Sequence, residues 1–167
     1  MDMEKSTENK ESRDSSLTDM VEQVQSEKIR NYINGRVIPQ MKWYSSKSRE
    51  CKRKYYRCMT ISILLGILIP VISVFADGAI EVKALLAFLG AAVTADNAYL
   101  SLHNFKDLWL DYRITRERLL RTLYCYFNDA GIFSQGNTQA EKDVLLVNVC
   151  EEELIRENNG WQSSMKE

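Results

Sequence analysis

Two long apolar runs dominate the pattern of polar and hydrophobic positions along the chain. Residues 59–76 carry no charged side chain and include eleven Leu, Ile, Val and Phe residues. A short polar segment separates them from a second run, residues 84–102, which only Asp96 and Asn97 interrupt. An uncharged run of about 18 residues is long enough to cross a bilayer as a helix. The pattern therefore predicts a transmembrane helical hairpin over residues 59–102.

Insertion energies favour this hairpin over a soluble helical core that buries the same two runs. The first run contributes about −5 kcal/mol on transfer to a membrane, before small penalties for its Ser, Gly and Pro residues. The second contributes about −4 kcal/mol, of which Asp96 cancels roughly 3 kcal/mol. We therefore expect the first helix to insert unaided and the second to insert as its partner.

Helical periodicity continues on both sides of the hairpin. Residues 41–57 form a basic amphipathic helix that we expect to run directly into the first span. Residues 104–127 combine an apolar face with a charged face, which predicts a long helix continuous with the second span. Thr138 and Glu141 have the spacing of a capping box at the start of a last helix. No stretch shows the alternation of a strand, so the sequence predicts an all-α membrane protein with long amphipathic helices before and after the hairpin.

The pattern divides the chain into five parts. The first is rich in Ser, Glu, Lys, Asp and Asn and has almost nothing to bury, which is typical of disorder. In order they are a disordered acidic and polar tail (1–25), a cytoplasmic basic amphipathic helix (26–58), the hairpin (59–102), a cytoplasmic helical region (103–161) and a C-terminal tail (162–167).

The charge distribution predicts the orientation of the hairpin. The net charge is only −1, with 22 basic and 23 acidic residues, but residues 28–57 hold a run of Lys and Arg opposed by Glu50 alone. Basic residues beside a span face the cytoplasm, so a multi-pass topology with both termini cytoplasmic is predicted. The same cluster attracts anionic lipid headgroups. Because the cations adjoin a span, the lipid bilayer is the expected partner and nucleic acid is not.

Two sets of hairpin residues are candidates for helix packing or for lining a pore. Small residues at helical spacing let helices approach closely in lipid, although the same face is also compatible with a pore lining. The packing candidates are Ser62, Gly66, Pro70 and Ser73. The pore-lining or selectivity candidates are Asp96, Gly90, Thr94, Asn97 and Ser101.

Asp96 is the most informative of these residues because an ionisable side chain inside a span faces protein or water. In a ring of subunits it would form a ring of negative charge that favours cations. The alternative is that Asp96 pairs with a basic residue of the cytoplasmic helices. A proton relay between Asp96 and His103 is a further hypothesis, against which stands a histidine satisfied at the membrane interface.

Motifs for catalysis are missing from the sequence. It has no phosphate-binding Gly loop and no Ser or Cys nucleophile paired with a histidine motif. The four cysteines and the single histidine do not have the spacing of a zinc site. We therefore predict neither an enzyme nor a bound metal or cofactor.

Two motifs resemble those of the SLATT family, bacterial domains with two transmembrane helices. The first is Trp-Tyr-x-x-Lys within residues 39–56, and the second is Trp-x-x-Tyr-Arg-x-Thr within residues 105–117. Their characteristic side chains are Trp43, Tyr44, Lys47, Trp109, Tyr112 and Arg113. The aromatic ones are also residues expected near a headgroup layer or in helix packing. The resemblance implies a standalone, uncharacterised member of that family in the bacterial cytoplasmic membrane, which perforates membranes in bacterial conflict.

Two functions follow from these predictions. The first is a homo-oligomeric channel or pore that conducts ions, since a single hairpin does not enclose an aqueous path. The second is a membrane-anchored interaction or scaffold protein, in which the hairpin only holds the cytoplasmic helices at the membrane. A continuous polar path through an oligomer distinguishes the first from the second.

Overall fold

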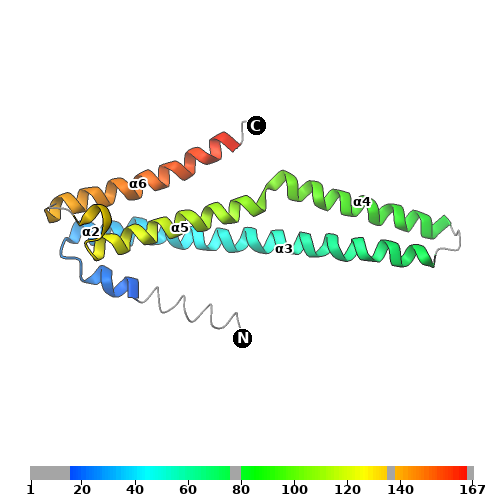
Figure 1. The fold of residues 1–167 in the computed structure, drawn as a ribbon, viewed down its shortest axis with the longest axis horizontal. Coiled ribbons are helices and arrows are strands. Elements are labelled where there is room, and N and C mark those ends of the chain that lie inside the picture. The colour runs from blue at the N-terminus through cyan, green and yellow to red at the C-terminus, as the bar shows by residue number, and fades with distance from the viewer. Residues whose placement is uncertain (1–15, 76–79, 135–137, 165–167) are drawn as a thin grey trace. The chain divides into compact units, whose positions relative to one another are not determined.

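The computed structural model describes residues 16–75, 80–134 and 138–164, and these residues form helices and no strands (Figure 1). The prediction of an all-helical chain with two long apolar helices is confirmed. A short helix covers residues 16–22. The elements that follow are α2 (Glu27–Tyr32), the π-helix η1 (Ile33–Val37), α3 (Ile38–Val74), α4 (Ile80–His103), α5 (Phe105–Phe127), the 3₁₀ turn η2 (Gly131–Phe133) and α6 (Gln139–Ser164).

The chain divides into two compact units. We call Met1–Ser45 together with Ile114–Glu167 the terminal unit, and Ser46–Arg113 the hairpin unit. The hairpin unit contains most of α3, all of α4 and the beginning of α5. Within it α3 and α4 run side by side in opposite directions (Figure 1), because only five residues connect Val74 to Ile80.

Helix α3 confirms that the basic segment runs directly into the first apolar run. It is 37 residues long and contains Pro70 in its interior. Proline supplies no N–H to the helix, and the hydroxyl of Ser73 donates a hydrogen bond of 2.8 Å to the Pro70 carbonyl, one turn earlier. Helix α3 therefore continues past Pro70, and the Ser73 hydroxyl has its partner within the same helix.

The predicted continuity between the second apolar run and the following helix is wrong. Asn104 has a φ of 41°, so α4 ends at His103 and α5 begins at Phe105. Figure 1 shows the bend at this point. Asparagine is one of the few residues that enter the left-handed region readily, and the Asn104 carbonyl accepts the N–H groups of Asp107 and Leu108 in the first turn of α5. The left-handed conformation of Asn104 therefore separates two helices where the sequence pattern predicts one.

The terminal unit has a conventional hydrophobic core. Along α2, η1 and the start of α3, buried residues recur every three or four positions. Buried residues on α5 and α6 follow the same helical spacing, and Phe133 of η2 is 1% exposed. The core residues of these elements are Ile29, Ile33, Val37, Met41 and Tyr44, then Leu119, Leu120, Leu123 and Tyr126, then Leu146, Cys150 and Leu154.

Both predicted tails are shorter than the sequence suggests. Residues 16–22 are helical although they fall in the range predicted as a disordered tail, and Leu17 and Val21 are 5% and 1% exposed. Burial of these side chains offsets the entropy of ordering a polar segment. At the other end α6 extends to Ser164, into the predicted C-terminal tail.

The predicted capping box at the start of α6 is confirmed. The hydroxyl of Thr138 and its backbone N–H both donate to the Glu141 carboxylate, at 3.0 and 2.7 Å. The Glu141 N–H donates back to the Thr138 hydroxyl at 3.4 Å. These reciprocal bonds satisfy donors that the first turn of a helix leaves free.

Candidate functional site

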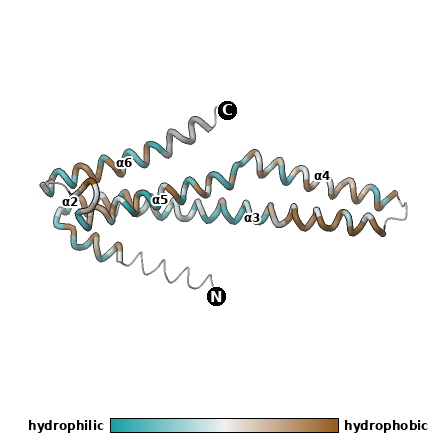
Figure 2. Tube along the Cα trace, viewed as in Figure 1, coloured by the Kyte–Doolittle hydropathy of each residue, from teal (hydrophilic) through white to brown (hydrophobic). Residues whose placement is uncertain are grey.

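The apolar helices of the hairpin contact each other along one face and leave their other faces exposed. On α3 the partly buried positions between 62 and 72 share one helical face, and on α4 those between 82 and 100 do the same. On α3 they are Ser62, Leu65, Ile69 and Ile72, and on α4 they include Val82, Leu86, Leu89, Val93, Asp96 and Leu100. Figure 2 shows that the two facing segments are the most apolar parts of the chain.

Little of this apolar surface is covered by the chain itself. Two helical stretches, Glu27–Val74 and Ile80–Phe133, each contain an 18-residue window long and apolar enough to cross a membrane, and no residue of either window is buried. Phe75, Ile80 and Leu102 are 77–80% exposed. The soluble-core alternative requires these side chains to be buried within the chain, and they are not.

Asp96 faces α3, and a polar contact there ties the two helices together. The hydroxyl of Ser62 donates a hydrogen bond of 2.5 Å to the Asp96 carboxylate. Burial, followed by the nearby Asp96 carboxyl, raises the pKa of the Cys58 thiol, one turn earlier on α3. Asp96 therefore faces protein, as expected for a carboxylate in an apolar helix. Sequence reasoning missed Ser62 as its partner, although both residues were already candidates within the hairpin.

The predicted basic partner of Asp96 is not found. Among the described residues Asp96 accepts a hydrogen bond from Ser62 and forms no ion pair. The described contacts of His103 are with Tyr99, whose carbonyl lies 3.1 Å from Nδ1, and with the ring of Phe105, whose centroid lies 5.1 Å away. The two groups of the hypothetical proton relay thus have separate partners.

Only part of the small-residue face of α3 meets α4. Ser62 lies at the contact, but Gly66, Pro70 and Ser73 are exposed. A Cβ added to Gly66 meets no atom within 4 Å. Apart from Ser62, this face does not form the contact inside the hairpin. Contact with another copy of the chain stays a prediction for the other three residues.

The polar stripe of α4 also points away from α3. Thr94, Asn97 and Ser101 are exposed, and Gly90 is partly buried. The hydroxyl of Thr94 donates to the Gly90 carbonyl at 3.0 Å, and the amide of Asn97 donates to the Val93 carbonyl at 2.9 Å. Bonds to the same helix satisfy polar side chains without water or a neighbouring helix.

The exposed small and polar residues of the two helices lie on the same side of the hairpin. At about 100° per residue, Gly66, Pro70 and Ser73 are rotated about a quarter turn from the face of α3 that meets α4. The stripe of α4 is rotated about a quarter turn, in the same sense along its chain, from the face that meets α3. Because the two helices are antiparallel, both rotations point to one side. Asp96 lies between the helices and not on this side.

Large apolar side chains occupy the opposite side of the hairpin. The same rotation, taken in the other sense, leads to bulky residues on both helices. Their exposed fractions range from 43 to 80%. They are Ile61, Leu64, Leu68 and Phe75 on α3, and Leu85, Phe88, Tyr99 and Leu102 on α4. The hairpin thus has one bulky apolar side and one small, partly polar side.

The residues of the two sequence motifs differ in their burial. Trp43 is 45% exposed, whereas Tyr44 and Tyr112 are 3% and 4% exposed, so the two tyrosines pack within the protein. Lys47 pairs with Glu50, and Arg113 is exposed. The backbone carbonyl of Trp109 accepts a hydrogen bond of 2.9 Å from Ser48, which links α5 to α3 inside the hairpin unit.

Polar contacts in the terminal unit are of a different kind, because they join separate elements. Glu151 of α6 accepts hydrogen bonds from Tyr32 at 2.9 Å and from Arg36 at 3.2 Å. The bond from Arg36, followed by that from Tyr32, lowers the pKa of the Glu151 carboxyl against the opposing effect of burial. Burial, with the bond to Glu151, raises the pKa of Tyr32. This cluster was not predicted, since Glu151 lies more than a hundred residues along the chain from Tyr32 and Arg36.

No metal site is present in the part of the chain that the structure describes: no three His, Cys, Asp or Glu side chains gather there. A search of curated proteins gave no match. A search of solved structures likewise gave none. A family model does match residues 39–141, which cover the hairpin unit and more than half of the chain. This protein therefore belongs to the family described as "Protein of unknown function (DUF4231)".

Proposed function

We propose that this protein is an integral membrane protein whose hairpin (59–102) spans the bilayer and assembles with other copies into a channel. The observation that carries the proposal is the two-sided hairpin, with bulky apolar residues on one side and small and polar residues on the other. Neither side is covered by the chain. An apolar surface of this size requires lipid or protein to cover it.

Two observations support insertion of the hairpin in lipid. In a bilayer every polar group needs an internal partner, and the described hydroxyl and amide groups of Ser73, Thr94 and Asn97 all bond to carbonyls of their own helix. The apolar segment of α3 also begins directly after a basic segment, the arrangement that orients a span with its preceding residues in the cytoplasm. This supports a cytoplasmic position for both termini.

A second copy of the chain fits the small side. Gly66 leaves room for another helix to approach closely, and the stripe of Thr94, Asn97 and Ser101 would then line the space enclosed by a symmetric ring. In this arrangement Asp96 fixes the pairing of α3 with α4. The ring of Asp96 carboxylates remains a separate prediction, tested by reversal potentials of Asp96→Asn in asymmetric salt.

The resemblance to the SLATT family extends the proposal to a biological role. The Trp43, Tyr44 and Lys47 motif and the Trp109, Tyr112 and Arg113 motif support membership of that family. On this basis we propose that the protein resides in the bacterial cytoplasmic membrane and perforates it as a defence effector. Ion leakage from cells that express the intact chain tests this role.

Topology is tested by cysteine labelling of intact cells. A cysteine introduced for Gly78, which lies outside the described residues, should react with an impermeant reagent added from outside. Cys125 and Cys150 should not. Cys150 is fully buried, so the informative native residue is Cys125, and its labelling from outside would contradict the cytoplasmic placement.

Oligomer formation is tested by a matched pair of substitutions on opposite sides of the hairpin. Gly66→Leu places bulk on the small side and should shift the detergent-solubilised protein from oligomer to monomer and abolish conductance in planar bilayers. Ala95→Leu places bulk on the large apolar side, where lipid accommodates it, and should leave both unchanged. Equal effects of the two variants would contradict the proposed contact. An oligomer without conductance would favour a membrane-anchored scaffold.

A further inference from the structure

The basic segment of α3, residues 41–57, carries different charges on its different faces. Glu50 pairs with Lys47 at 3.4 Å and with Lys54 at 2.8 Å. Arg53 and Arg57 have no hydrogen bond or acidic partner among the described residues, and both are exposed. The segment therefore has one face on which Glu50 offsets part of the positive charge, and another face on which no acidic residue does so.

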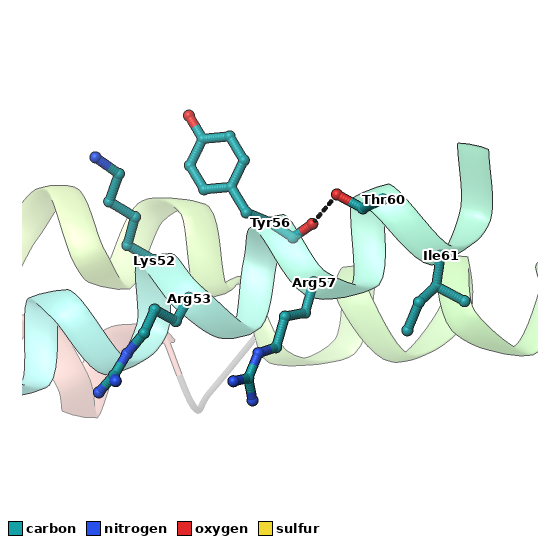
Figure 3. Close-up of a pocket in the computed structure, with 6 residues that line it drawn as sticks. All are labelled: Lys52, Arg53, Tyr56, Arg57, Thr60 and Ile61. Atoms are coloured by element: carbon teal, nitrogen blue, oxygen red, sulfur yellow. Dashed lines mark hydrogen bonds between the residues drawn. The ribbon is translucent and has the colours of Figure 1, made fainter. Parts of the chain in front are cut away.

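The free charge borders a shallow hollow of about 530 Å³ on the surface of α3. Lys52 and Tyr56 project from one flank, and Arg53 and Arg57 project from the other (Figure 3). Thr60 lies between the flanks with its hydroxyl bonded to the Tyr56 carbonyl at 2.8 Å. The ammonium group of Lys52 lies 5.8 Å from the Tyr56 ring centre and 5.6 Å from that of Trp109, which leaves the two guanidinium groups as the free cations.

The position of the hollow along the helix matches the headgroup layer of a membrane. The uncharged run begins at residue 59, and with a rise of 1.5 Å per residue Arg57 and Arg53 precede it by about 3 and 9 Å. The headgroup layer of one leaflet is about 5–7 Å thick. Long arginine side chains extend along the helix to reach charged groups. Ile61, at the other end of the hollow, is apolar and 49% exposed, where an acyl chain would begin.

We propose that Arg53 and Arg57, which project from the flank of this hollow opposite to Lys52 and Tyr56, bind the phosphate headgroup of an anionic phospholipid at the cytoplasmic boundary of the hairpin. Guanidinium groups form paired hydrogen bonds with phosphate oxygens. Two of them, one helical turn apart, fit a single phosphate or two adjacent ones. A zwitterionic lipid brings its own cation into the same hollow and is therefore disfavoured. This inference rests on the proposed insertion of the hairpin.

The test measures which lipids remain bound to the intact chain. The protein is reconstituted into vesicles of phosphatidylglycerol and phosphatidylcholine in equal amounts with identical acyl chains, and membrane insertion is verified by resistance to alkaline carbonate. After extraction into mild detergent, mass spectrometry gives the ratio of the two retained lipids. We expect phosphatidylglycerol to be enriched. Each arginine near an anionic surface contributes roughly a fivefold preference, so R53Q/R57Q should remove most of the enrichment.

A matched control separates a site from general attraction between charges. K47Q/K54Q removes the same number of cations from the same helix, but from the pairs with Glu50, and should keep the enrichment. All four side chains are exposed or partly exposed, and circular dichroism verifies that each variant is folded. Equal loss in both double variants, or equal retention of the two lipids by the unmodified chain, would overturn the inference.

Two further outcomes separate this inference from its alternatives. If an excess of inorganic phosphate removes the enrichment, the hollow binds a free anion and not a lipid, which overturns the inference. If carbonate releases the chain from vesicles, the proposed insertion fails and the lipid site fails with it. Insertion without enrichment overturns the lipid site alone and leaves the proposed function intact.

Discussion

The terminal unit buries most of its leucine side chains, whereas the apolar hairpin exposes many of its own. Leu119, Leu123 and Leu146 are 0% exposed in the terminal unit, whereas Leu64 and Leu102 of the hairpin are 55% and 80% exposed. The difference follows from periodicity. Helices α5 and α6 each have an apolar face and a charged face, and their apolar faces are buried within the terminal unit. The hairpin helices are apolar on nearly every face, which is typical of helices covered by another molecule or a membrane.

Polar side chains differ between the two regions in the same way. In the terminal unit several of them bond across elements, as Tyr126 does to Asp143 at 2.6 Å, while Asn128 and Ser134 bond to carbonyls of nearby residues. In the hairpin they bond mainly within one helix, as Thr94 and Asn97 do. The contact between Ser62 and Asp96 is the exception.

The largest expected effect is the removal of a buried leucine from the terminal unit. Leu146→Ala should destabilise the detergent-solubilised chain by about 2–5 kcal/mol, because it leaves a cavity in a packed core. Leu64→Ala should change stability by less than about 0.5 kcal/mol, as exposed substitutions usually do. Thermal unfolding followed by circular dichroism measures both. Similar losses would show that the hairpin has a core of its own.

A charge placed in the hairpin tests what covers it. Ile67 is 58% exposed near the middle of the uncharged run, so Ile67→Lys should raise the cost of insertion by about 3 kcal/mol. The fraction of chain that resists alkaline carbonate should fall accordingly. Val144 is 61% exposed in the terminal unit, and Val144→Lys is the control that should leave this fraction unchanged. Unchanged insertion of Ile67→Lys would argue against a lipid-facing position.

The next largest effect is expected from loss of the contact between the two hairpin helices. Ser62→Ala removes the donor to Asp96, and a hydrogen bond to a charged group contributes about 1.5–3 kcal/mol. Thr94→Ala removes only a bond within α4 and should have a much smaller effect. Loss of helicity during titration with SDS compares the two variants. If both variants unfold like the unmodified chain, the Ser62 contact does not stabilise the hairpin.

The smallest expected effect is a pH dependence confined to the terminal unit. The folded pKa of Glu151 is lowered below its ordinary value of 4.5, first by the hydrogen bond from Arg36. Its stabilising contribution is therefore present above pH 4.5 and is lost as the pH falls through the lowered pKa. Because the pair is partly exposed, we expect at most about 1 kcal/mol. Melting temperatures between pH 3 and 7 should show a shallower decline for Glu151→Gln, and an identical decline would exclude the pair as its source.

Local features of the fold were predictable from the sequence because each depends on a few neighbouring residues. The uncharged run, the basic segment before it and the absence of strand patterns are enough to predict α3 and the hairpin. Thr138 and Glu141 predict the start of α6 from their spacing alone. The bend at Asn104 was missed, since an asparagine inside an apolar and charged pattern is compatible with a helix as well as with a left-handed residue.

The residues that share a helix face could be predicted from the sequence, because the helical period is constant. The rotation of the helices against each other depends instead on tertiary contacts. Two mostly apolar helices pack in several rotations with similar energies, and the structure selects the one that gives Asp96 the Ser62 hydroxyl as a partner and leaves Gly66 exposed. The cluster of Tyr32, Arg36 and Glu151 likewise depends on segments far apart in the chain. Burial of Leu17 and Val21 has the same origin, because a polar segment is ordered only where apolar surface is available to cover its few hydrophobic side chains.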